Sequence, residues 1–227
     1  MAEPLLAARG LNKQFRSGNQ PVAVLSDLAL QLGRGESLAL TGRSGSGKST
    51  LLNILCGLEQ PDAGRIEVLD EIFDSGKPAG SSQVEARWAQ LRRQQVGVVF
   101  QDANLMPALS LLDNVRLRAR LAGRSEDPCR DWLERLGIGE LAGRYPDQVS
   151  GGQRQRAALA MVFAMNPALI LADEPTGSLD RHTAEAVTRQ LFELQARHGC
   201  ALILATHDAE LATRCTHHLD LGHQPDN

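Results

Sequence analysis

A glycine-rich segment between a short apolar run and a helical pattern constrains the fold of this chain more than any other feature. It reads Gly-Arg-Ser-Gly-Ser-Gly-Lys-Ser over residues 42–49, after the apolar residues 37–40 and before the helical pattern of residues 50–55. Glycines let successive backbone N–H groups point inward without Cβ clashes, and the helix N-terminus adds partial positive charge. A strand, this loop and a helix in that order predict a phosphate-binding loop on a parallel sheet.

This segment, called the phosphate loop below, predicts a nucleotide site. Lys48 is expected to reach the β- and γ-phosphates, and the Ser49 hydroxyl is expected to bind Mg²⁺. A Gly/Ser loop that only caps a helix is the other interpretation, and the correct flanks on both sides disfavour it. The expected nucleotide contacts are Gly42, Ser44, Gly45, Gly47, Lys48, Ser49 and Thr50.

Two adjacent carboxylates follow a second apolar run. Residues 168–172 read Ala-Leu-Ile-Leu-Ala and lead directly into Asp173 and Glu174. Ligands of open α/β sheets bind at the carboxyl ends of the strands. We therefore expect Asp173 to hold Mg²⁺ and Glu174 to orient or deprotonate an attacking water. An acidic helix start after a core strand is the alternative.

The signature segment, residues 150–153, reads Ser-Gly-Gly-Gln and starts another helical pattern. Ser150 is a typical N-cap, and the glycines expose N–H groups at the helix start, which makes a second anion site. One nucleotide is already served by the phosphate loop, so the second site suggests that two subunits complete each other. Alone, the segment is equally well explained as ordinary helix-start chemistry.

The remaining pattern predicts an α/β chain with a P-loop NTPase (RecA-like) core. Apolar runs at 96–100 and 201–205 indicate further buried parallel strands. Residues 1–35 and 65–73 alternate and predict an antiparallel β layer. Helical patterns dominate from 102 to 160. The expectation is one domain over 1–227, with its core at about 1–85 and 161–227 and an inserted helical subdomain at about 86–160.

Composition excludes several classes of protein. The net charge of −3 and the 4% aromatic content argue against a nucleic-acid partner. The longest apolar run, residues 157–165, is far short of the roughly 20 residues that span a bilayer. No signal peptide is expected, and the cysteines lack metal-ligand spacing. We interpret the end of the chain, with Cys215 and three histidines, as a solvated, loosely ordered tail rather than a metal site.

Taken together, the motifs resemble those of ABC transporter ATP-binding subunits. The phosphate loop, the acidic strand, the signature segment and Thr-His-Asp at 206–208 all match, as do Gln101 after its strand and residues 178–180. The resemblance implies an ATPase that forms an ATP-sandwich dimer with a second copy of itself and uses ATP and Mg²⁺. Glu174, His207, Lys48 and Gln101 would form its catalytic set.

The resemblance also implies a role for each remaining position. Phe15 would stack on adenine, with a core Phe as the alternative. Gln101 would bind Mg²⁺ and sense the γ-phosphate, while its loop faces a membrane partner. His207 would contact the γ-phosphate, with a capping histidine as the alternative, and Asp180 would bridge the dimer. The γ-phosphate held by the opposite subunit would be bound by Ser150, Gly151, Gly152 and Gln153.

Residues 98–101, 104–107 and 172–180 are similar to the subgroup that contains LolD, MacB and YbbA ATPases. That subgroup implies a separate MacB/FtsX-type integral membrane permease, used for export or for lipoprotein and envelope substrates, and a position on the cytoplasmic face of the inner membrane. Alternatives are a soluble ABC ATPase that acts on nucleic acid or ribosomes and a nucleotide-gated regulatory subunit. A small GTPase is disfavoured, because residues 12–15 lack the guanine-reading Asp and precede the phosphate loop.

Overall fold

The computed structural model describes residues 3–18, 20–75, 82–177 and 179–223. Contacts divide the chain into two compact units. Unit 1 comprises Met1–Gln90 with Ala201–Asn227, and unit 2 comprises Leu91–Cys200. The sequence also predicts a connection over residues 75–82, most of which lies outside the described residues. The expected domain and subdomain boundaries stay a prediction.

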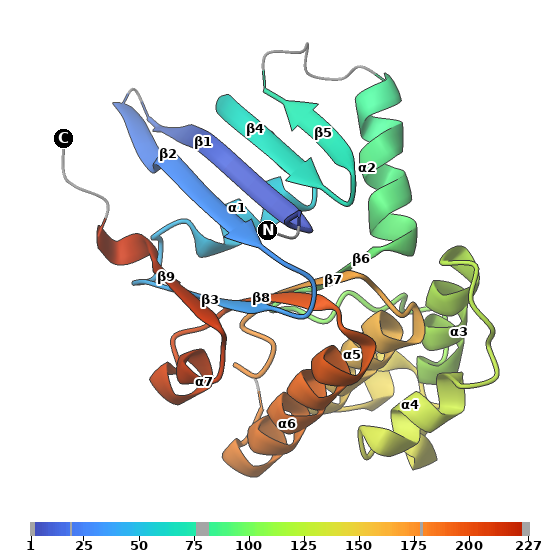
Figure 1. The fold of residues 1–227 in the computed structure, drawn as a ribbon. Coiled ribbons are helices and arrows are strands. Elements are labelled where there is room, and N and C mark those ends of the chain that lie inside the picture. The colour runs from blue at the N-terminus through green and yellow to red at the C-terminus, as the bar shows by residue number, and fades with distance from the viewer. Residues whose placement is uncertain (1–2, 19, 76–81, 178, 224–227) are drawn as a thin grey trace. The chain divides into compact units, whose positions relative to one another are not determined.

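The first sheet of unit 1 is the antiparallel layer that the alternating pattern predicted. Its strand order is β2-β1-β4-β5 (Figure 1). Alternate positions are buried over residues 11–13 of β1 and 66–68 of β4, because successive side chains point to opposite faces, whereas residues 6–8 of β1 are all buried. The four strands are β1 (Leu6–Ser17), β2 (Gln20–Leu32), β4 (Ala63–Val68) and β5 (Glu71–Asp74).

A parallel group in unit 1 carries the phosphate loop. β3 (Ser37–Thr41) lies between β8 (Ala201–Ala205) and β9 (His217–Asp220) and is parallel to both. β3 and β8 are almost wholly buried, as their apolar runs predicted. The helices that begin in this unit are α1 (Lys48–Leu55), α2 (Ser82–Gln94) and α7 (Ala209–Thr213), with a 3₁₀ turn at Leu221–His223.

The prediction of a loosely ordered tail is wrong for residues 215–223. β9 pairs with β3 from Leu38↔His217 to Thr41↔Asp220. Ser37 and Thr216 exchange hydrogen bonds beside this ladder, and His218 Nε2 lies 2.7 Å from Thr41 Oγ1. The strand is mostly exposed, so backbone pairing rather than burial orders it.

Unit 2 combines two parallel strands with the helices expected from the pattern. β6 (Val96–Val99) pairs with β7 (Leu169–Asp173). The packing of β6 against α5 is close: a Cβ on Gly97 would lie 2.6 Å from Val162 Cγ1. The helices are α3 (Leu111–Leu121), α4 (Cys129–Arg135), α5 (Gly151–Ala164) and α6 (Arg181–His198), with 3₁₀ turns at Gly139–Leu141 and Pro146–Gln148.

Within the described residues, no helix is both long and apolar enough to cross a bilayer.

Candidate functional site

The phosphate loop has the backbone geometry that its glycines predicted. Gly47 has φ 94°, and a Cβ there would lie 2.7 Å from Val24 Cγ1 on β2. Gly42 and Gly45 also have positive φ. At Gly42, a Cβ would meet the backbone nitrogen of Gly222 at 3.2 Å. The loop is therefore held between β2 and the segment that follows β9.

Helix α1 starts from this loop without a side-chain cap. Gly47 is its N-cap, so the first N–H groups have no side-chain acceptor at the cap. Lys48 Nζ donates to the carbonyls of Gly42 at 2.8 Å and of Arg43 at 3.2 Å. Ser46 Oγ is buried without a hydrogen-bond partner among the described residues. This set of donors can bind the oxygens of a polyphosphate.

His207 follows the strand next to β3. Leu40 pairs with Ala205, and Thr206 N donates to Leu40 O at 3.0 Å. The carboxyl ends of two parallel neighbours therefore bring exposed His207 and the phosphate loop to one edge. Asp208, the next residue, caps α7 by accepting from two backbone N–H groups.

Phe15 lies near the end of β1, opposite Val22 on β2. Its side chain is 42% exposed, so the alternative of a buried core Phe is wrong. Lys13 Nζ lies 5.1 Å from the ring centroid and also pairs with Glu59 Oε1 at 2.5 Å. The exposed ring presents an aromatic surface on the same hairpin that contacts Gly47 through Val24.

In unit 2, β6 and β7 bring the acidic pair and Gln101 to one edge. Val99 pairs with Ala172, so exposed Gln101 and half-buried Asp173 and Glu174 follow adjacent strand ends. Glu174 has φ 47°, a left-handed conformation that is rare outside glycine and that clusters at functional sites.

The signature segment forms a complete capping box. Gln153 N donates to Ser150 Oγ at 3.3 Å, and Ser150 N donates to Gln153 Oε1 at 2.8 Å. Gly151 is exposed and Gly152 is half-buried. Arg154 supports this turn by donating to the carbonyls of Pro146 and Val149.

Asp180 is the N-cap of α6, accepting from Thr183 N at 3.0 Å and from Thr183 Oγ1 at 2.6 Å. These hydrogen bonds hold the pKa of the exposed Asp180 carboxyl below its usual value. Ser178, two residues before Asp180, lies outside the described residues.

Two buried amides near Gln101 were not identified from the sequence. Gln155 on α5 donates from Nε2 to Phe100 O at 3.0 Å, and its side chain is 1% exposed. Asn114 on α3, also 1% exposed, accepts from Met106 N and donates to the carbonyls of Met106, Leu109 and Ser110. A polar residue on the apolar face of a helix was the only available signal.

The donor types present suit a hard cation. The residues predicted to hold Mg²⁺, Ser49 in unit 1 and Gln101 and Asp173 in unit 2, carry hydroxyl, amide and carboxylate oxygens, which are ligand types that Mg²⁺ prefers. Among the described residues there is no cluster of three His, Cys, Asp or Glu side chains that would hold a metal without phosphate ligands.

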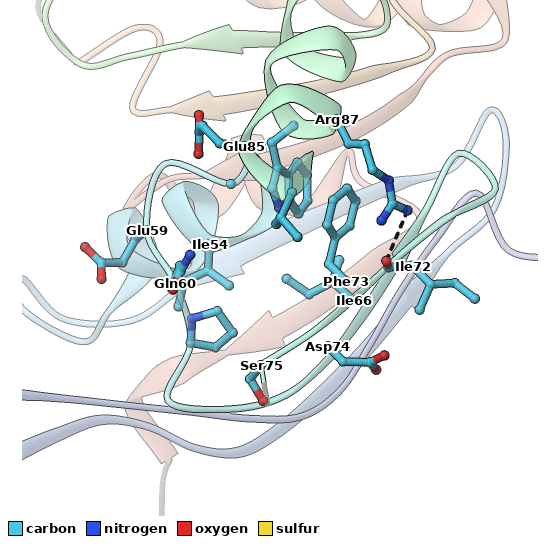
Figure 2. Close-up of a pocket in the computed structure, with 14 residues that line it drawn as sticks. Ile54, Glu59, Gln60, Ile66, Ile72, Phe73, Asp74, Ser75, Glu85 and Arg87 are labelled. Atoms are coloured by element: carbon cyan, nitrogen blue, oxygen red, sulfur yellow. Dashed lines mark hydrogen bonds between the residues drawn. The ribbon is translucent and has the colours of Figure 1, made fainter. Parts of the chain in front are cut away.

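None of the predicted site residues lines the pocket in Figure 2. Phe73 and Trp88 stack there with centroids 3.8 Å apart. Arg87 closes one side, where it pairs with Glu71 and donates to Ile72 O at 3.2 Å. The pocket is separate from the predicted nucleotide contacts.

Comparison with known proteins yields close matches. The chain matches the family described as ABC transporter over residues 25–177. It is 43% identical over 218 residues to YbbA of Escherichia coli K12, an ABC transporter ATP-binding protein, covering 94% of this chain and 92% of YbbA. Identity to LolD of Bordetella pertussis, the ATP-binding protein of a lipoprotein-releasing system, is 41% over 230 residues, covering 98% and 96%.

The chain is also similar to the macrolide export ATP-binding/permease protein MacB of Rhodopseudomonas palustris. Identity is 42% over 226 residues, covering 98% of this chain but 33% of MacB.

Two solved structures share the fold over most of their length. The dimeric bacterial ABC transporter cassette MJ0796 gives a TM-score of 0.85 at 32% identity, covering 96% of this chain and 95% of that one. The same cassette, dimeric and bound to ADP and Pi after hydrolysis, gives a TM-score of 0.83 at 32% identity and the same coverage.

Proposed function

The chain belongs to the ABC transporter family as an ATP-binding ATPase subunit, and we propose that it hydrolyses ATP in a head-to-tail dimer at two shared sites. One observation carries the proposal: the chain has two unlike helix starts that can each bind phosphate. α1 has a glycine N-cap, and α5 begins with a serine hydroxyl and two glycines. A single nucleotide needs only the first of them.

The phosphate loop would bind ATP on its own subunit. Lys48 would exchange the carbonyls of Gly42 and Arg43 for β- and γ-phosphate oxygens, a move that its flexible stem allows. Phe15 would stack on the adenine. The backbone N–H groups of the loop and of Thr50 would hold the remaining oxygens. Mg²⁺ held by Ser49, Gln101 and Asp173 would neutralise phosphate charge.

Hydrolysis requires a positioned water and stabilisation of the negative charge on the phosphates in the transition state. Glu174 would orient the water and take its proton as the water oxygen bonds to the γ-phosphorus and the bridge to ADP breaks. His207 and Lys48 would stabilise charge on the γ-phosphate. The partner subunit would add the Ser150 hydroxyl together with Gly151, Gly152 and Gln153, and Asp180 would lie at the dimer contact.

The mechanical output would go to a membrane permease. ATP binding closes the dimer, hydrolysis opens it, and the loop after Gln101 passes the movement on. The chain is similar to LolD, the ATP-binding protein of a lipoprotein-releasing system, and to the macrolide export ATP-binding/permease protein MacB, which supports a MacB/FtsX-type permease as its partner. The proposed location is the cytoplasmic face of the inner membrane, with an export, lipoprotein or envelope substrate.

The test is Glu174→Gln in the purified chain. We expect ATP binding to be retained, phosphate release to fall at least 100-fold, and a stable dimer to appear on size-exclusion chromatography with ATP. Glu185→Gln, an exposed acid on α6, is the matched control and should behave as wild type. Unchanged turnover in Glu174→Gln would remove that residue from the mechanism. Undiminished specific activity in strictly monomeric protein would overturn the shared sites.

A further inference from the structure

The buried amide of Gln155 links two segments that the proposed mechanism uses separately. Gln155 lies on α5, five positions after Ser150, and its Nε2 donates to Phe100 O at 3.0 Å. Phe100 directly precedes Gln101. One side-chain hydrogen bond therefore joins the helix of the signature segment to the backbone beside Gln101.

The link is rigid because α5 and β6 are also closely packed. Gly97 on β6 leaves no room for a methyl group beside Val162 of α5. Phe100 comes just after the β6–β7 ladder ends at Val99, so its carbonyl lies beyond the strand pairing. Removal of the Gln155 donor would leave this carbonyl without that partner, a loss comparable to other broken buried hydrogen bonds.

The other end of the Gln101 loop is fixed as well. Asn114 holds the backbone from Met106 to Ser110 through four hydrogen bonds. Gln155 binds the backbone at Phe100, and Asn114 binds it again from Met106 onward. The stretch between these two points is short, and Gln101 lies at its start. A movement of α5 would therefore displace the backbone at Phe100, directly before Gln101.

We propose that Gln155 is a positioning residue that couples the two ATP sites of the dimer. The inference rests on the proposed function, in which Ser150 acts on the nucleotide of the partner subunit and Gln101 acts on the nucleotide of its own. Contact of Ser150 with one γ-phosphate fixes α5, and the Gln155–Phe100 hydrogen bond then fixes Gln101 at the other. ATP at one site thus favours the active arrangement at the second.

The experiment uses Gln155→Met, which removes the donor at nearly constant volume. Three quantities are measured: the ATP affinity of dilute monomer, the Hill coefficient of hydrolysis, and the ATP concentration that half-dimerises protein carrying Glu174→Gln. We expect the affinity to stay within twofold, the Hill coefficient to fall to about 1, and the dimerisation midpoint to rise about tenfold.

The matched control is Gln195→Met, the same exchange at a buried amide of α6. It should keep the wild-type Hill coefficient and dimerisation midpoint even if thermal stability falls. The coupling role is overturned if Gln155→Met keeps the wild-type Hill coefficient and the wild-type dimerisation midpoint. It is also overturned if the Hill coefficient of the wild-type protein is itself 1. Absence of hydrolysis and of ATP-induced dimers in the parent proteins would instead overturn the proposed function.

If Gln155→Met fails to fold, hydrogen exchange on the Glu174→Gln chain decides the question. ATP should protect backbone amides of residues 96–101 and 150–155 with one common midpoint. Two separate midpoints would show that the segments respond independently and would overturn the proposal.

Discussion

Two helices of this chain start at proposed phosphate sites, and they start in opposite ways. α1 has a glycine N-cap at Gly47 with φ 94° and no side-chain cap. α5 has Ser150 as N-cap in extended conformation, and its capping box is complete. The first start has no side-chain acceptor at its cap, whereas at the second two backbone N–H groups already donate to side chains of the capping box.

In the proposed function, this difference gives one fold two kinds of anion site. The phosphate loop depends on backbone shape, which only glycine permits, and on Lys48 for charge. Ser150 depends on one hydroxyl that already accepts a hydrogen bond from Gln153 N. A hydroxyl can still donate while it accepts, so Ser150 can cap its helix and bind a phosphate at once.

Lys48→Ala tests the charge of the first site and should give the largest effect. ATP affinity and the rate of hydrolysis should each fall at least 100-fold, because the variant lacks the lysine that would bind the β- and γ-phosphates. In the structure, this lysine donates to two carbonyls of the phosphate loop. The free energy of unfolding should change by less than about 1 kcal/mol, since the lysine is half-exposed. Nucleotide titration and thermal melts measure both. A variant that still binds ATP as tightly as wild type would contradict the assignment.

Gly47→Ala against Gly151→Ala tests the backbone shape. Gly47→Ala should destabilise the chain by about 2–4 kcal/mol, from the left-handed φ and the overlap with Val24. At Gly151 the nearest atom to a new Cβ is Arg154 Nη2 at 3.8 Å, so the change should stay within about 0.5 kcal/mol. Chemical denaturation measures both; equal losses at the two positions would erase the contrast.

Ser150→Asp against Ser150→Ala separates capping from phosphate binding at α5. Alanine should cost about 1 kcal/mol of stability, because the N-cap is lost, whereas aspartate caps equally well and should cost little. Both should lower hydrolysis about tenfold, aspartate because its charge repels phosphate. Hydrolysis by Ser150→Asp at the wild-type rate would leave Ser150 a cap alone.

Asp180 at α6 gives the smallest effect and shows what a titrating cap adds. Hydrogen bonds from Thr183 lower the pKa of its carboxyl below the ordinary 3.8. Its contribution to stability is therefore complete above about pH 4 and is lost as the pH falls further. Thermal melts between pH 3 and 6 should show this acid loss, and Asp180→Asn should weaken it; identical pH profiles would refute the assignment.

Much of the fold was predictable because local pattern and tertiary environment agree. The runs at 37–40 and 201–205 are buried strands, since short, mainly apolar segments between turn residues suit a parallel sheet that is covered on both faces. β9 was missed because half-polar His217–Asp220 is ordered by pairing with β3 rather than by its own side chains.

The local structure of the candidate site was predictable where a motif is contiguous and unpredictable where it depends on distant partners, and the roles of its residues stay a prediction. The phosphate loop combines glycines, strand and helix in one short stretch. Gln155 and Asn114 acquire their roles from carbonyls at Phe100 and Met106, which the sequence cannot place beside them. The left-handed φ of Glu174 could not be predicted either, because non-glycine residues seldom adopt this conformation and a glutamate does not indicate it.

The contact between Gly222 and the phosphate loop has a practical consequence for handling the protein. Gly222 N lies so close to Gly42 that a Cβ there would be 3.2 Å away. A purification tag fused directly after residue 223 would begin beside the phosphate loop, where the proposed function places ATP, and is expected to interfere with nucleotide entry. Affinity handles and fluorophores are therefore better attached at the amino terminus, and truncation back into β9 should weaken ATP binding.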